Sequence, residues 1–175
     1  MDYKKFEVLI SKKEIEKRIK VLAKEIDKKY GKEPITFVCV LKGAVVFYVK
    51  LLECLKNKKV EFDFIQLKSY EGQESSGVVK VVKDSSINFE NKNVVLVEDI
   101  IDTGITANFL YEYFLNKKAK DILMCSLLQK PEKLKVELKI PTLVGFNIPN
   151  KFIFGYGLDL DEEYRNVNDI LVFEE

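Results

Sequence analysis

Hydrophobic residues along this chain recur with two periods, one typical of α-helices and one typical of buried β-strands. Ser11-Lys-Lys-Glu14 has the form of a capping box, and apolar residues follow at helical spacing as far as Tyr30, where Gly31 supplies a stop. An apolar stretch at 44–55 and an amphipathic one at about 105–116 are also predicted as helices.

Short apolar runs separate these helices and have the length of strands. They lie at 35–41, 60–67, 78–82, 94–97, 122–128, 142–146 and 152–156. The polar, glycine-bearing stretch 69–77 is predicted as a loop. Strands that alternate with helices are typical of an α/β domain with a central, mostly parallel sheet flanked by helices. No repeat, low-complexity tract or composition shift marks a linker, so we expect a single domain over residues 1–175.

One strand organises the candidate chemistry. The run 94–97 reads as a strand buried on both faces, and it is followed at once by Glu98 and Asp99 and then by Asp102. Open α/β sheets bind ligands at the carboxyl ends of their strands. Because crowded carboxylates repel one another and desolvate badly, we expect a cation or a ligand with hydroxyl groups beside them.

The turn after these acids, Thr103-Gly-Ile-Thr106, leads directly into a predicted helix. Backbone amides of this turn, its two hydroxyls and the helix N-terminus together suit a phosphate group. Glu98 and Asp99 beside it suit sugar hydroxyls. A phosphorylated sugar would satisfy both halves of the arrangement.

Asp102-Thr-Gly also admits other interpretations. In the simplest of them, Asp102 or Thr103 only caps the following helix. Aspartic proteases carry the same tripeptide, but their fold is all-β and they need a second aspartate to share a proton. The strand and its acids also fit a Walker B pattern, yet the chain contains no G-x-x-x-x-G-K-[ST], so we reject a P-loop NTPase.

Further polar residues are predicted at the same edge of the sheet. Lys42-Gly43 lies between a strand and a helix, either as a turn with a solvated lysine or as a second anion site. The loop from Ser69 to Gly77 is either a surface loop or a lid that excludes water. Phe152 would usually be a core residue, and Arg165 would usually be solvated, although it also suits an anion.

The amino-acid composition of the chain excludes several classes of function. The chain has 175 residues, a net charge of +1 and no histidine, which removes the usual general base and the usual zinc ligand. The near-neutral charge argues against nucleic acid and against a membrane surface. The apolar stretch 35–55 is interrupted by Lys42 and Lys50, so we interpret it as strand, turn and helix of a cytoplasmic protein. Cys39 and Cys125 are predicted as buried thiols.

Four motifs in order make the sequence resemble the hypoxanthine (hypoxanthine-guanine) phosphoribosyltransferases of the short bacterial kind. The phosphoribosyl-pyrophosphate signature of that family is matched by Val-Leu-Val-Glu98-Asp99-Ile-Ile-Asp102-Thr-Gly-x-Thr106, and its pyrophosphate loop by Leu41-Lys42-Gly43-Ala44. Its mobile catalytic loop is matched by Lys68-Ser69-Tyr70 with Ser76-Gly77, and its purine-binding hood by the stretch from Ile148 to Asn166.

The resemblance implies a role for each matching residue. Glu98 and Asp99 would hold the ribose hydroxyls and Mg²⁺, and Asp102 would accept the proton at purine N7. The 5′-phosphate would lie on Asp102, Thr103, Gly104, Ile105 and Thr106, and pyrophosphate on Lys42, Gly43 and Arg165. Ser69 and Tyr70 would belong to the mobile loop. Lys130, Lys151, Phe152 and Ile153 would bind the purine, and Asp159 would serve that site and a second Mg²⁺.

The resemblance further implies a type I phosphoribosyltransferase fold with a small hood at about 141–175. The activity would be Mg²⁺-dependent transfer of 5-phosphoribose from 5-phosphoribosyl 1-pyrophosphate to a 6-oxopurine, by a homodimer or homotetramer without nucleic-acid or membrane partners. The alternative is a regulatory protein on the same fold that binds nucleotides and RNA, although RNA would favour a more basic face. An adenine or orotate enzyme fits Lys130 and the Lys-Phe-Ile hood poorly.

Overall fold

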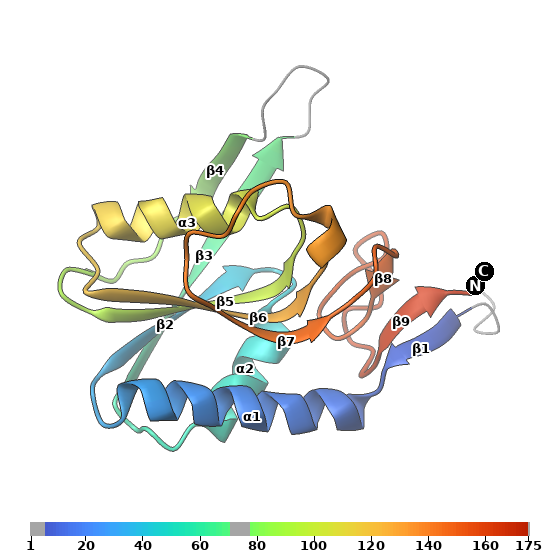
Figure 1. The fold of residues 1–175 in the computed structure, drawn as a ribbon, viewed down its shortest axis with the longest axis horizontal. Helices are drawn as coiled ribbons and strands as arrows, with labels where there is room; N and C mark the ends of the chain where they lie inside the picture. Colours follow the sequence, from blue (N-terminus) through green and yellow to red (C-terminus); the bar gives the residue numbers. More distant parts are fainter. Residues whose placement is uncertain (1–5, 71–77, 175) are drawn as a thin grey trace.

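The computed structural model describes residues 6–70 and 78–174, and these form a sheet covered by helices on both faces beside a smaller sheet (Figure 1). The elements in chain order are β1 (Phe6–Ile10), α1 (Lys12–Tyr30), β2 (Ile35–Leu41), α2 (Val45–Cys54), β3 (Val60–Tyr70), β4 (Val78–Lys83), β5 (Asn93–Ile101), α3 (Ile105–Asn116), β6 (Asp121–Gln129), the 3-10 turn η2 (Pro131–Lys133), β7 (Thr142–Asn147), β8 (Ile153–Phe154) and β9 (Ile170–Phe173).

The larger sheet has the strand order β4-β3-β2-β5-β6-β7. All neighbouring pairs are parallel except β3 and β4, which form an antiparallel edge. This confirms the predicted α/β class. Because β2, β5 and β6 are parallel neighbours, their carboxyl ends and the loops that follow them meet at one edge.

The two faces of the sheet have separate apolar cores. Val95 and Val97 of β5 pack with α1 and α2, whereas Val94 and Leu96 pack with α3 on the other face. Figure 1 shows α3 on one side of the sheet and α1 with α2 on the other. All four side chains are fully buried, which confirms the strand that was predicted from its uninterrupted apolar run.

Local signals fixed the helix ends correctly. Both halves of the Ser11–Glu14 capping box form at the start of α1, and the amide of Gly31 donates to the Asp27 carbonyl at its end. The stretch 35–55 divides into β2 and α2 as predicted, and within the described residues no helix is long and apolar enough to cross a membrane. Cys39 and Cys125 are buried free thiols, also as predicted.

The predicted loop at 69–77 needs a correction at its start. Ser69 and Tyr70 are the last residues of β3 and are paired with Val79 and Val78 of β4. The antiparallel partner extends β3 beyond its apolar run, which ends at Leu67. Residues 71–77 of the predicted lid lie outside the described residues.

The smaller sheet, with strand order β1-β9-β8, was only partly predicted. The sequence pattern missed β1 and β9, which are antiparallel partners, because both are short and lie at opposite ends of the chain. The predicted strand 152–156 shortens to β8. In addition, β7 pairs with β6 in the larger sheet, and the smaller sheet includes the N-terminal strand β1.

An aromatic cluster holds the smaller sheet together. The ring of Phe154 is fully buried, and its centroid lies 4.9 Å from that of Phe6, 5.4 Å from Tyr164 and 5.7 Å from Phe173. The rings of Phe6 and Tyr164 meet that of Phe154 edge to face, a favoured geometry for aromatic pairs. Phe154 therefore links β1, β9 and the segment around Tyr164.

We expect Phe154→Ala to lower the free energy of unfolding by about 3–5 kcal/mol, because it removes the central ring of this cluster and leaves a cavity. Phe152→Ala is the matched control, since Phe152 is 56% exposed two residues away. The control should change stability by less than about 1 kcal/mol. Urea unfolding followed by circular dichroism measures both. Equal losses in the two variants would contradict the assigned role of Phe154.

Candidate active site

Glu98 and Asp99, near the end of β5, have carboxyl groups that contact each other but also different further neighbours. The strand continues to Ile101, so Glu98 and Asp99 are consecutive strand residues and their side chains alternate. Glu98 lines a cavity of about 90 Å³ together with Asp102, Thr103 and Thr106. Glu98 and Asp102 share this cavity, and the side chains of Glu98 and Asp99 contact each other, so the three acids lie close together.

Asp99 faces the Lys42-Gly43 loop instead. A Cβ atom built on Gly43 would overlap the Asp99 carboxylate, so only glycine fits at this position. A Cβ on Gly157 would in turn overlap the Gly43 carbonyl. The peptide bond between Leu41 and Lys42 is cis. These close approaches bring the loop after β2, the end of β5 and the segment before Asp159 together.

Burial dominates the electrostatics of Glu98 and Asp99. The pKa of Glu98 is raised well above its usual value, first by burial and then by the charge of Asp99. Burial also raises the pKa of Asp99, although hydrogen bonds and the nearby Arg165 oppose the change. Glu98 Oε2 is buried and lacks a hydrogen-bond partner among the described residues. The pair therefore favours either a bound proton or a nearby cation.

Asp102 has one engaged oxygen and one free oxygen. Its Oδ2 accepts a hydrogen bond from Lys133 Nζ at 2.8 Å, whereas its buried Oδ1 has no partner in the part of the chain that the structure describes. Lys130 is 7% exposed, and burial lowers its pKa while the charge of Asp102 opposes this. Two lysines thus surround a carboxylate that still has an oxygen available as an acceptor.

The turn after Asp102 has the geometry of an open helix N-terminus. The cap of α3 is Gly104 with a φ of 82°, and no side chain caps the helix. The interpretation that Asp102 or Thr103 merely caps this helix is therefore wrong. The first-turn amides, including those of Thr106 and Ala107, have no acceptor within the helix. Ile105 N donates only a long 3.4 Å bond to Thr103 Oγ1, which leaves this end available to an anion.

The two cations predicted to bind pyrophosphate lie close to the same acid. Lys42 Nζ and an Arg165 guanidinium nitrogen both lie 3.0 Å from Glu162 Oε2. The same guanidinium nitrogen lies 2.9 Å from Asp159 Oδ1, and the other one donates to the Gly157 carbonyl at 2.9 Å. Residues that are far apart in the sequence therefore meet in one group of opposite charges.

The residues predicted to bind the purine are divided between the two sheets. Lys130 directly follows β6 and its amide donates to the Ile101 carbonyl, which places it near the end of β5. Ile153 is buried in β8, and Lys151 and Phe152 are exposed. Phe152 is therefore not a core residue; its ring centroid lies 6.1 Å from that of Phe173.

The residues predicted to hold metal do not form one cluster. Among residues 6–70 and 78–174, no three Asp, Glu, Cys or His side chains gather as a metal site. Glu98 and Asp99 contact each other, whereas Asp159 is paired with Arg165. Magnesium usually keeps several waters and takes one or two carboxylates plus substrate oxygens, so it does not need such a cluster.

Two residues near the site were missed by sequence reasoning. Lys133 contacts Asp102 across 31 positions of sequence, and nothing in its local pattern indicated this. Glu162 belongs to an acidic run beside Arg165, and that run was the signal that could have drawn attention to it.

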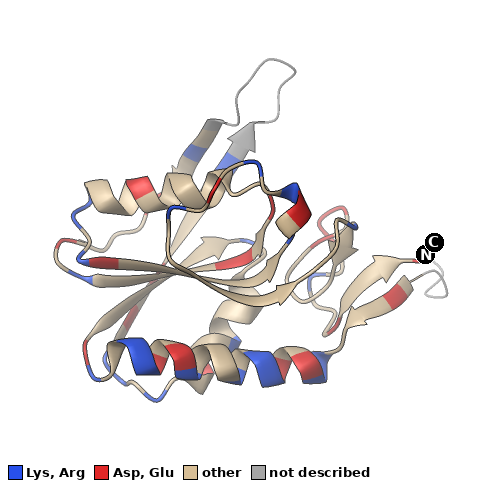
Figure 2. Ribbon diagram, in the orientation of Figure 1, with Lys and Arg blue, Asp and Glu red and all other residues tan. Residues whose placement is uncertain are grey.

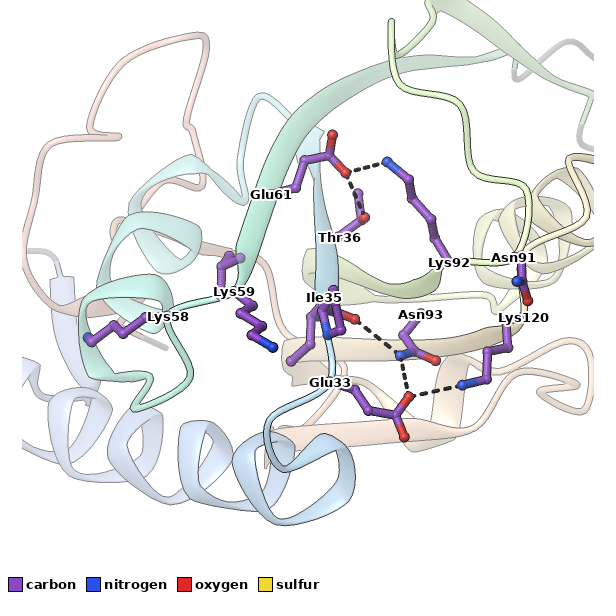
Figure 3. A pocket seen from close by; sticks show the side chains of 12 residues that line it. Glu33, Ile35, Thr36, Lys58, Lys59, Glu61, Asn91, Lys92, Asn93 and Lys120 are labelled. Atoms are coloured by element: carbon purple, nitrogen blue, oxygen red, sulfur yellow. Dashed lines mark hydrogen bonds and ion pairs between the residues drawn. The ribbon is translucent and has the colours of Figure 1, made fainter.

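A larger hollow, of about 620 Å³, lies at the opposite edge of the sheet (Figure 3). It borders the beginnings of β2, β3 and β5, and none of the predicted site residues lines it. Each of its glutamates already has a cationic partner: Glu61 is paired with Lys92, and Glu33 with Lys120. Because ligands of open α/β sheets bind at the carboxyl ends of strands, we place the candidate active site at the other edge.

Comparison with known proteins gives one consistent result. The phosphoribosyl transferase domain family matches residues 9–161. A hypoxanthine-guanine phosphoribosyltransferase of Aquifex aeolicus is 41% identical over 174 residues, which is 98% of this chain and 97% of that protein. One from Bacillus subtilis is 40% identical over 161 residues, covering 91% and 88% of the two chains.

Solved structures agree with these matches. A crystal structure of a hypoxanthine-guanine phosphoribosyltransferase from Bacillus anthracis, with a HEPES molecule in its active site, superposes with a TM-score of 0.90. Its sequence is 43% identical, and the match covers 96% of this chain and 98% of that one.

The raised pKa of Glu98 predicts a pH-dependent stability. In the unfolded chain this carboxyl ionises above about pH 4.3, whereas the folded protein keeps its proton to higher pH. Its contribution to stability is therefore present at low pH and is lost as pH rises toward the folded pKa. Glu98→Gln should be more stable than the parent at pH 8, because the amide places no charge in the buried site.

Urea unfolding in EDTA at pH 4 and pH 8 measures this difference. At pH 4 the two proteins should have nearly equal stability. Glu132→Gln, which changes an exposed acid next to Lys133, is the control. Its difference from the parent in free energy of unfolding should be the same at both pH values. A constant difference between Glu98→Gln and the parent at both pH values would contradict the prediction.

Proposed function

Because this chain belongs to the phosphoribosyl transferase domain family, we propose that it transfers 5-phosphoribose from 5-phosphoribosyl 1-pyrophosphate to hypoxanthine or guanine. The products are IMP or GMP and pyrophosphate, and the role is purine salvage. The names of its relatives support this activity. The observation that carries the proposal is the pair of unpartnered buried oxygens, on Glu98 and Asp102, in a cavity beside an open helix N-terminus.

The phosphate end of the substrate lies on the turn before α3. Backbone amides of Gly104, Ile105 and Thr106, with the hydroxyls of Thr103 and Thr106, hold the 5′-phosphate. Ile105 stands where many members of the family carry a basic residue, so amides and the helix dipole supply most of the attraction here. Glu98 and Asp99 accept hydrogen bonds from the ribose hydroxyls.

Asp102 accepts the proton from purine N7. The chain contains no histidine, so a carboxylate must act as the base. The 2.8 Å bond from Lys133 holds Oδ2, and Oδ1 remains available to the purine. Lys133 therefore orients the base while leaving one acceptor free.

The leaving group is anionic, and its departure builds positive charge on the ribose ring, as in glycoside hydrolysis. Lys42, Arg165 and the amide of Gly43 neutralise the pyrophosphate. The carboxylates near the ring suit the developing cation.

The donor set fits Mg²⁺, which is the proposed cofactor. Glu98 and Asp99 offer hard oxygen ligands, and their raised pKa values reflect buried charge that a divalent cation would balance. Asp159 is the acid proposed for a second ion, beside Arg165. When bound, Mg²⁺ neutralises the diphosphate and so makes it a better leaving group.

The purine is held by residues from both sheets. Lys130 donates to the 6-oxo group, and its lowered pKa reflects burial that would strengthen this bond. Phe152 supplies an exposed aromatic face for stacking, and the backbone of Ile153 and the side chain of Lys151 contact the edge of the base. Ser69 and Tyr70, the last residues of β3, are the described part of the proposed mobile loop.

The protein is proposed to act in the cytoplasm as a homodimer or homotetramer. Exposed apolar side chains of Val45, Val49 and Phe62 on α2 and β3 support self-association. Figure 2 shows acidic and basic residues mixed along α1 and the loops. This mixture does not favour the alternative of a regulatory protein that binds RNA.

The direct test mixes the protein with Mg²⁺, 5-phosphoribosyl 1-pyrophosphate and, separately, hypoxanthine, guanine, xanthine or adenine. Nucleotide formation followed by chromatography should appear with hypoxanthine or guanine and should be absent with adenine. No turnover with any 6-oxopurine would overturn the proposed function.

Asp102→Asn should lower kcat by ~10²–10⁴-fold, because the amide keeps the shape of the side chain but cannot accept the N7 proton. Glu132→Gln, one residue from Lys133, is the matched control and should keep the parent rate. Full activity of Asp102→Asn at every pH would remove Asp102 from the role of base.

A further inference from the structure

Glu162 lies where the pyrophosphate of the substrate is proposed to bind. One of its carboxylate oxygens, Oε2, lies 3.0 Å from Lys42 Nζ and 3.0 Å from a guanidinium nitrogen of Arg165. Both cations therefore already contact an anion. A carboxylate oxygen at this distance occupies the position that a phosphate oxygen would take.

Glu162 lies in a turn that has an uncommon backbone conformation. Leu160 and Glu163 are bonded to each other in both directions, and the two residues between them, Asp161 and Glu162, have φ values of 53° and 65°. Two left-handed residues in this position favour asparagine, aspartate and glycine. A glutamate is strained in this left-handed conformation. The geometry of the turn therefore does not explain why a glutamate occurs at position 162.

A further contact fixes the turn relative to the cations. The amide of Glu162 donates to Asp159 Oδ2 at 3.0 Å, and Asp159 Oδ1 in turn contacts Arg165. The side chain of Glu162 itself is 67% exposed. The backbone of the turn is therefore held in place, while the carboxylate can leave into water without rearrangement of the fold.

We propose that Glu162 is an internal competitor for the diphosphate group: its carboxylate occupies Lys42 and Arg165 until a diphosphate displaces it. This inference rests on the proposed function, in which those two cations bind pyrophosphate. The competition weakens binding of the diphosphate substrate and promotes release of the pyrophosphate product. It does not affect the purine, which is held by other residues.

Glu162→Gln tests the inference, because it removes the charge and keeps the size of the side chain. The KM for 5-phosphoribosyl 1-pyrophosphate should fall roughly 2- to 10-fold, the range expected for one or two exposed ion pairs. The KM for hypoxanthine should not change. The Kd of inorganic pyrophosphate with Mg²⁺, measured by calorimetry without turnover, should fall by a similar factor.

Two further variants keep the test decisive. Glu163→Gln removes the same charge from the same turn, and Glu163 is not paired with Lys42 or Arg165, so it should leave both constants unchanged. Glu162→Gly removes the carboxylate and also relieves the left-handed conformation. It should therefore bind pyrophosphate more tightly and unfold at a higher temperature, even if the glutamine variant folds poorly.

The outcomes separate this inference from the proposed function. If the parent turns over 6-oxopurines but Glu162→Gln and Glu163→Gln bind pyrophosphate equally, the inference is wrong and the function stands. Weaker binding by both Glu162 variants would also overturn it, since Glu162 would then support the site. If the parent neither binds pyrophosphate nor forms nucleotide, the proposed function itself fails.

Discussion

Burial of negative charge at the end of β5 is the constraint on which the rest of the candidate site depends. A strand covered on both faces must be apolar, yet this one ends in Glu98 and Asp99 before it leaves the sheet. Burial raises the pKa of both acids, because a charged carboxylate is poorly solvated there. Keeping both acids charged in the folded protein therefore costs electrostatic free energy. Binding of the proposed cation or of ribose hydroxyls there would relieve this energy and so stabilise the fold.

Close backbone contacts position the basic side chains that lie near these acids. Gly43 lies directly against Asp99, and Gly157 lies directly against Gly43, so side chains at either glycine would separate the loops. Through these contacts Lys42 and Arg165, from opposite halves of the chain, reach the same carboxylate of Glu162. The site thus has its own counter-ions in place before any ligand arrives.

Local sequence patterns predicted most helices and strands. The strands that they missed depend on pairing with segments far away in the sequence. The capping box of α1, the start of α3 at Ile105 and the buried core of β5 follow from interactions within a few residues, which a sequence displays directly. The strands β1 and β9 pair the two ends of the chain, and Tyr70 is in a strand because β4 lies beside it. The hydrophobic periodicity of a short segment does not indicate which strand it will pair with.

The sequence by itself determined the fold class and the family, and it predicted the acids, the turn and the basic residues of the candidate site. Motifs at fixed spacing achieve this because each depends on one strand end and the loop after it. Only the tertiary structure decided that Glu98 and Asp102 share a cavity, that Lys133 holds Asp102, and that Glu162 contacts both Lys42 and Arg165. The pair of Lys133 with Asp102 and that of Lys42 with Glu162 join residues 31 and 120 positions apart, so no local pattern indicates them.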